Sequence, residues 1–133
     1  TTHPMNPLHR LAIVARMSLA LLPLFAPPSA TADDWSTDDK TRFAAVITSY
    51  LVDWHQTRQI AAEPTRYTER NPLLGRHPGA RTVNTYFAIA GISTYYLADH
   101  LTPVWRTRLL VGILTLEASI IANNHHLGLK LTF

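Results

Sequence analysis

Two long stretches of this chain carry almost no charge, and only a short turn separates them. No Asp, Glu, Lys or Arg occurs from Thr82 to Ala98, and Glu117 is the single charged residue from Leu109 to Asn124. Between the stretches, Thr102-Pro103 is a typical helix start, a capping residue followed by proline. We therefore expect two antiparallel helices, from about 82 to 101 and from 102 to about 124, each near the ~20 residues that cross a bilayer.

An earlier helix is predicted to begin at Ser36 or Thr37 and to continue to about Ala62. Two acidic residues follow its start, where the helix dipole favours negative charge, and Pro64 ends it. No segment shows sustained strand-like alternation, and the chain has no Cys, so disulfides cannot hold the fold. The expected fold class is all-α, a small helical membrane protein with about three antiparallel helices.

The first 32 residues have the features of a secretory signal peptide. Arg10 and Arg16 form a basic region, Met17 to Phe25 is apolar, and Ala30-Thr31-Ala32 matches an A-x-A cleavage site. We expect residues 1–32 to be removed on export and residues 33–133 to form a single helical membrane domain. The 12 Lys and Arg are spread singly along the chain, so no nucleic-acid binding is predicted.

Two features favour lipid as the surroundings of these helices. The second helix lacks the charged face that a solvated helix carries. Aromatic residues gather near the expected helix ends, as in interfacial belts; these are Trp35, Trp54, Tyr86, Phe87, Tyr95, Tyr96 and Trp105. We expect a bacterial inner-membrane protein whose partners are the lipid bilayer and either other membrane proteins or further copies of itself. The alternative is a soluble periplasmic helical domain.

Polar residues within apolar helices are costly, so each marks a candidate site. The predicted topology brings one group to the same level at the helix ends, namely Asp53, Gln56, Asn84, Asn124 and His125. Glu117 lies part-way along the third helix and needs a partner, for which the candidates are Asp53, Tyr50 and Tyr95. The expected packing seam of the second helix is a stripe of small and polar residues, Asn84, Ala88, Gly91, Tyr95 and Asp99.

Two interpretations of these polar residues stay open. In the first they form a hydrogen-bonded clamp between the helices, and in the second they line a pocket for a metal, a proton path or a small ligand. No metal site or cofactor is predicted, since no His-x3-His or Glu-x2-His pair occurs and adjacent histidines point apart on a helix. A haem held by His55 and His125 is the weaker interpretation.

The chain shows no Ser-His-Asp spacing, glycine-rich phosphate loop or paired-carboxylate motif. We therefore expect a protein that is not an enzyme and that serves as an accessory or structural subunit of a membrane assembly. One alternative is a membrane binding or transport module with a polar intramembrane site. The other is the soluble periplasmic domain.

Three short motifs give the chain a resemblance to known proteins. They are Asp53-x-x-Gln56-Thr57, Glu69-x-Asn71-Pro72-x-Leu74-Gly75-x-His77-Pro78 and Val83-Asn84-x-Tyr86-Phe87. This order resembles small uncharacterised bacterial membrane proteins, over roughly residues 35–128. The resemblance implies a helical fold and a membrane location, without an established activity, and it draws attention to the loop.

Within that loop, the site candidates are Glu69, Asn71, Pro72, Gly75 and His77. Asn71 is predicted to cap a single helical turn that begins with Pro72. Gly75 is predicted to end this turn in the left-handed conformation.

Overall fold

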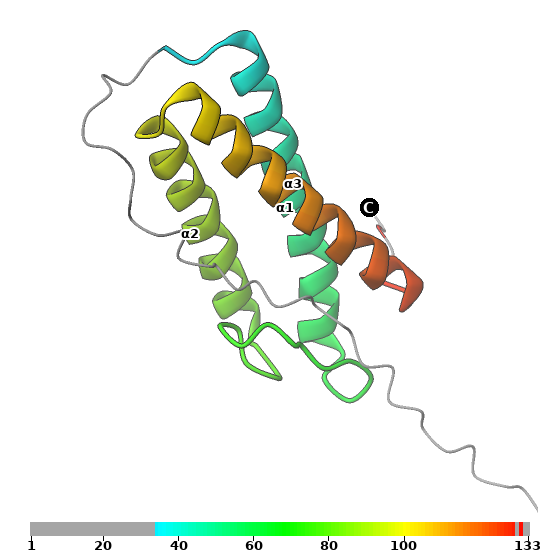
Figure 1. The fold of residues 1–133 in the computed structure, drawn as a ribbon. Helices are drawn as coiled ribbons and strands as arrows, with labels where there is room; N and C mark the ends of the chain where they lie inside the picture. The colour runs from blue at the N-terminus through cyan, green and yellow to red at the C-terminus, as the bar shows by residue number, and fades with distance from the viewer. Residues whose placement is uncertain (1–33, 130, 132–133) are drawn as a thin grey trace, which may run out of the picture.

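In the computed structural model, which describes residues 34–129 and 131, the chain forms three α-helices (Figure 1). These are α1 (Thr37–Ala62), α2 (Ala80–Asp99) and α3 (Pro103–His126). The described residues contain no strand, so the predicted all-α class with three helices is confirmed. The predicted signal peptide, residues 1–32, falls outside the described residues.

The helix α1 is the centre of the bundle and packs against both other helices (Figure 1). α2 runs antiparallel to α1, and α3 turns back after α2, so that α1 and α3 run in the same direction. α2 and α3 share the fewest contacts and diverge from the turn that joins them. The end of α3 therefore lies on the other side of α1 from α2, whereas the second half of α1 lies beside the start of α2.

Local sequence explains where the elements begin and end. The Ser36 hydroxyl accepts a hydrogen bond from the Asp39 amide at 3.1 Å, and the Asp39 carboxylate accepts one from the Ser36 amide at 3.2 Å. This capping box satisfies two amides at the start of α1. As predicted, Pro103 begins α3, and Gly75 has φ +75° where it closes the turn after Asn71.

The apolar core lies where α1 faces the other two helices. Its buried members include Val46 and Tyr50 from α1, Val83 and Phe87 from α2, and Leu110 from α3. The side chains from α1 occupy the centre because α1 contacts both neighbours. Burying each large apolar side chain contributes about 1.5–3 kcal/mol, so this contact zone holds the helices together in the absence of disulfides.

The packing face of α2 differs from the predicted seam. Its buried residues recur at helical spacing and are Val83, Phe87, Thr94 and Ala98. In the predicted stripe, Asn84, Gly91 and Tyr95 do contact α1, but at the margin of this face, because Asn84, Ala88 and Tyr95 are exposed. The prediction is therefore right about contact with α1 in part and wrong about which side chains are buried. The larger apolar side chains remove more area from water against α1 than a stripe of small residues would. Gly91 does approach α1, where an added Cβ would lie 3.7 Å from the Ile47 Cδ1 atom.

The three helices were also tested for the length and apolar character that a membrane span requires. Among the described residues, no helix combines the two to the degree needed to cross a bilayer. The prediction that these helices are membrane spans is therefore unsupported.

Candidate functional site

Five buried polar side chains gather where α1, α3 and the connector of residues 63–79 meet. This buried polar cluster consists of Asp53, Thr57, Glu69, Glu117 and Asn124, each at most 3% exposed. Sequence reasoning identifies Asp53, Glu117 and Asn124 as site residues and Glu69 as part of the loop motif. Thr57 belongs to the same D-x-x-Q-T motif as Asp53.

Asp53 links α1 to α3 within the cluster. Asn124 donates from Nδ2 to the Asp53 Oδ1 atom at 3.1 Å, and Thr57 Oγ1 lies 3.5 Å from the same oxygen. The two helices run in the same direction, which is why residues far apart in sequence meet near both helix ends. In a dry interior such a bond fixes the register, because sliding either helix by one turn leaves both groups without a partner.

Glu117 is the most isolated acid of the cluster. It is fully buried on α3, and neither carboxyl oxygen has a hydrogen-bond partner among the described residues. Its charge acts on Tyr50 of α1 and Tyr86 of α2, and the charge of Asp53 acts on it. Of the predicted neighbours, Asp53 and Tyr50 are therefore close.

The third predicted neighbour of Glu117, Tyr95, lies elsewhere. Its ring packs against Trp35 and Phe43, with ring centroids 5.6 Å and 5.8 Å away. This contact is near the opposite end of α1, so Tyr95 does not contribute to the cluster.

Glu69 joins the loop motif to the cluster. Its Oε1 atom accepts hydrogen bonds from the backbone amides of Arg70 at 2.8 Å and Asn71 at 2.7 Å, while Oε2 has no partner among the described residues. The Asn71 Oδ1 atom accepts from the Leu73 amide at 3.0 Å, which closes an Asx turn. The exposed members of the loop motif are Pro72, Gly75 and His77.

Burial raises the pKa of every acid in the cluster. Removal from water and the charge of Glu69 raise the pKa of Asp53 to about 7, against the hydrogen bonds from Thr57 and Asn124 that lower it. Removal from water and the charge of Asp53 raise the pKa of Glu117 to about 8. Burial also raises the pKa of Glu69, against its two backbone hydrogen bonds. Near neutral pH the cluster therefore carries fewer than three negative charges.

Asn84 is a predicted site residue that lies outside the cluster. It is exposed at the margin between α1 and α2, where its Oδ1 atom accepts from Trp54 Nε1 at 2.9 Å and from Arg58 Nη1 at 3.0 Å. Asn84 thus ties the start of α2 to the second half of α1. Within the described residues its hydrogen bonds go to Trp54 and Arg58 and not to the buried acids, so it serves as a surface tether.

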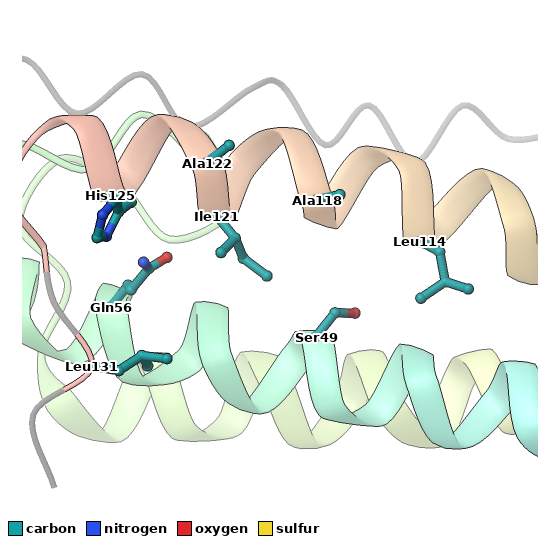
Figure 2. Close-up of a pocket in the computed structure, with 8 residues that line it drawn as sticks. All are labelled: Ser49, Gln56, Leu114, Ala118, Ile121, Ala122, His125 and Leu131. Atoms are coloured by element: carbon teal, nitrogen blue, oxygen red, sulfur yellow. The ribbon is translucent and has the colours of Figure 1, made fainter.

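Gln56 and His125 line a separate cavity of about 520 Å³ between α1 and α3 (Figure 2). Gln56 is buried and its Oε1 atom has no partner among the described residues, whereas His125 is exposed. The other lining residues are Ser49, Leu114, Ala118, Ile121, Ala122 and Leu131. The cavity wall is mostly apolar, with polar atoms from Ser49, Gln56 and His125.

A second buried polar contact, absent from the predictions, lies at the other end of the bundle. Arg106 of α3 is fully buried and its Nη1 atom lies 3.2 Å from the Asp39 Oδ2 atom of α1. Its guanidinium also donates to the Ala98 carbonyl at 2.9 Å and lies 5.1 Å from the centre of the Trp35 ring. Burial alone would raise the pKa of Asp39, but hydrogen bonds from Ser36 and Arg106 lower it.

The only sequence signal for this contact is weak. Arg106 lies in the first turn after the Thr102-Pro103 helix start. The positive end of the helix dipole disfavours a basic side chain there, so such a side chain is expected to extend into water, where the interaction is screened. The burial of Arg106 depends on two sets of partners. The turn between α2 and α3 places the carbonyls at the end of α2 beside it, and the packing of α1 against α3 brings Asp39 to it.

Within residues 34–129 and 131, no three His, Cys, Asp or Glu side chains stand close enough to hold a metal ion together. The chemistry that the cluster offers is therefore hydrogen bonding and proton exchange. Comparisons of the chain with models of protein families, with curated proteins and with solved structures find no match.

Proposed function

We propose that this protein is a non-enzymatic protein of the bacterial inner membrane, in which a three-helix bundle meets lipid with its outer surface and serves as an accessory or structural subunit. The observation that supports this proposal is the distribution of polarity. Beside its apolar core the bundle also buries five charged side chains, and several large apolar side chains lie on its outer surface. In water this arrangement is unfavourable twice over, since it buries charge and exposes apolar area.

The outer surface of α2 is the largest part of this apolar exterior. Ile89, Ile92 and Tyr96 are 58%, 69% and 61% exposed. No charged residue occurs among their neighbours from Thr82 to Ala98. A contiguous apolar surface of this kind marks a contact with lipid or with another protein.

The exterior of α3 also carries exposed apolar side chains, in its first half. The single charged residue between Leu109 and Asn124, Glu117, points inward and is fully buried, whereas Val111 is exposed. At the start of α3, Trp105 is also exposed, as is Tyr96 in the last turns of α2. Tyr and Trp prefer the boundary between lipid and water, so this end of the bundle fits the membrane interface.

This attachment does not require any helix to cross the bilayer. A bundle with an apolar face can rest in the interface, with that face about 5–10 Å deep at the boundary of headgroups and acyl chains. The Asp53–Asn124 and Asp39–Arg106 contacts join α1 to α3 at both ends. A bundle held in this way presents a constant outer surface, which is what a structural subunit needs.

A second candidate function is binding within the bundle. It is favoured by the buried carboxyl and amide oxygens that have no hydrogen-bond partner in the described part of the chain. That property is compatible with attachment to the membrane.

Membrane attachment is tested by extracting cell membranes with alkaline carbonate and by floating the purified chain with phospholipid vesicles. We expect the chain to stay in the membrane pellet and to float with vesicles. We also expect lipids with brominated acyl chains to quench the fluorescence of the exposed Trp105. Release into the carbonate supernatant together with no flotation would favour the soluble periplasmic domain and overturn the proposal.

The role as a subunit is tested by native electrophoresis of membranes dissolved in a mild detergent. We expect the chain to migrate as part of a discrete complex larger than the detergent-bound chain alone. Migration as a single chain under every mild condition would contradict a structural role in an assembly while leaving the membrane location intact.

A further inference from the structure

The buried polar atoms without partners are all of one chemical kind. In the described part of the chain they are Gln56 Oε1, Glu69 Oε2, both carboxyl oxygens of Glu117, and Asn124 Oδ1. Each is an oxygen that accepts hydrogen bonds, and among the buried side chains of the described residues no nitrogen donor is left without a partner. A dry interior with surplus acceptors lacks positive charge or protons, because an unpaired buried acceptor costs about 1–3 kcal/mol.

We infer that Glu117 and Asp53 form a proton-binding site inside the bundle, where the two carboxyl groups hold protons in place of a counter-ion. Glu117 is fully buried with no donor to either oxygen, and Asp53 is 3% exposed. A carboxylate in such surroundings takes up a proton, since an isolated charge is far more costly to bury than the neutral acid.

The groups that face Glu117 supply no positive charge. Asp53 and Tyr50 approach it from α1, Tyr86 from α2, and Glu69 of the connector acts on Asp53. The Tyr50 hydroxyl is bonded to Thr94 at 3.0 Å. None of the three acids forms an ion pair within the described residues, and no cation is among the groups that shift their pKa values.

A proton fits this site better than a metal ion does. In the described residues, no three His, Cys, Asp or Glu side chains stand within reach of one metal ion. A proton needs a single oxygen, and the electrostatics agree with this occupant, because burial raises the pKa of Asp53 to about 7 and that of Glu117 to about 8.

Release of the proton has a structural consequence. When the Glu117 carboxyl gives its proton to water, a carboxylate remains that has no donor and repels the charge on Asp53. The Asp53–Asn124 bond crosses the same contact between α1 and α3. Water must then enter between the helices, so proton binding and the closeness of α1 and α3 are coupled.

Infrared spectroscopy of the full chain tests the inference, because the carbonyl stretch of a protonated carboxyl group is separate from the bands of a carboxylate. At about pH 6 ordinary Asp and Glu side chains are ionised, so the remaining band reports buried acids. We expect this band at about pH 6, its loss by about pH 10, and roughly half its intensity in Glu117→Gln. Glu63→Gln, which alters a half-exposed acid on the surface, is the matched control and should leave the band unchanged.

Asp53→Asn provides a second variant should Glu117→Gln fail to fold. It should remove the share of the band that belongs to Asp53, leave the share of Glu117, and lower the pH at which Glu117 titrates, because a charge that opposes its ionisation is gone. Absence of the band from the native chain at about pH 6, or its persistence at full intensity in both variants, would overturn the inference. Loss of the band on adding NaCl or CaCl2 at constant pH would do so too, since a cation and not a proton would then be the occupant.

Discussion

Buried charge is handled differently at the two ends of the bundle, and single residues make the difference. Asp39 faces the guanidinium of Arg106 at 3.2 Å, so two opposite charges are buried together. Asp53 and Glu117 have no such partner in the described part of the chain, and their pKa values rise instead. The ion pair stabilises the buried charges of Asp39 and Arg106, whereas Asp53 and Glu117 lose their charge by binding a proton.

Arg106→Leu is expected to lower the free energy of unfolding by about 3–5 kcal/mol, because Asp39 would remain buried without its counter-charge. Chemical denaturation followed by circular dichroism measures the change. Arg108→Leu is the matched control: Arg108 is exposed, and its loss should change the free energy by no more than about 0.5 kcal/mol. Equal effects of the two substitutions would contradict the assigned role of Arg106.

Stability is expected to fall as the pH rises from about 4 to about 8. The pKa values of Asp53 and Glu117 are raised in the folded chain, so the folded state holds protons that the unfolded chain releases from about pH 4 upward. The favourable contribution is complete below the unfolded pKa values and is lost as the pH passes through the folded ones. Thermal unfolding over this pH range measures the trend.

The matched comparison for this pH dependence is Glu117→Gln against Asp38→Asn. The first variant should flatten the decline between pH 4 and 8, because one of the two titrating groups is gone. The second alters an exposed carboxylate of the first turn and should leave the decline as it is. A native chain that becomes more stable over this range would show that the cluster is ionised in the folded state.

At the scale of single elements, each turn and helix end depends on a small number of backbone requirements. The connector reverses direction at Gly75, whose φ of +75° suits glycine because it has no Cβ. Gly112 sits within α3, and nothing lies within 4 Å of a Cβ added there. Both glycines have room for a side chain, but only Gly112 has a backbone conformation that suits one.

Gly75→Ala is expected to lower the free energy of unfolding by about 1–2 kcal/mol, since L-residues disfavour the left-handed conformation by that amount. Gly112→Ala should raise it by up to about 1 kcal/mol, because alanine is the better helix former and meets no neighbour. Denaturant titration of both variants gives the signs. A stabilising Gly75→Ala would mean that the connector does not need the left-handed turn.

For the whole molecule, the distribution of apolar surface leads to a prediction about membrane binding. Ile92→Lys places a charge on the outer surface of α2, where Ile92 is 69% exposed. Because the side chain contributes little to the core, the free energy of unfolding should change by less than about 0.5 kcal/mol. Flotation with vesicles should drop severalfold, since the charge would have to leave water.

Ala62→Lys is the control for this substitution, because Ala62 is exposed and is the last residue of a different helix, α1. Flotation of this variant should equal that of the native chain. If Ile92→Lys floats as well as Ala62→Lys, lipid does not contact the outer surface of α2, and a protein partner becomes the better occupant.

Most of the fold can be predicted from this sequence, whereas only part of the candidate site can. The Thr102-Pro103 start, the proline after α1 and the Asn71 to Gly75 turn are local signals, and they locate the elements within a few residues. Asp53, Glu117 and Asn124 are identifiable because polar groups within apolar helices are rare. Asn84 and His125 satisfy the same rule, yet the structure leaves both at the surface.

The sequence alone determined three helices and their order, because capping residues, prolines and apolar periodicity act over a few neighbouring positions. Tertiary structure decided which face of α2 is buried, that Arg106 meets Asp39, and that Glu117 has no donor. These depend on the rotation of each helix about its axis and on its offset along its neighbour. Both are set by the summed packing of many side chains, which no local pattern records.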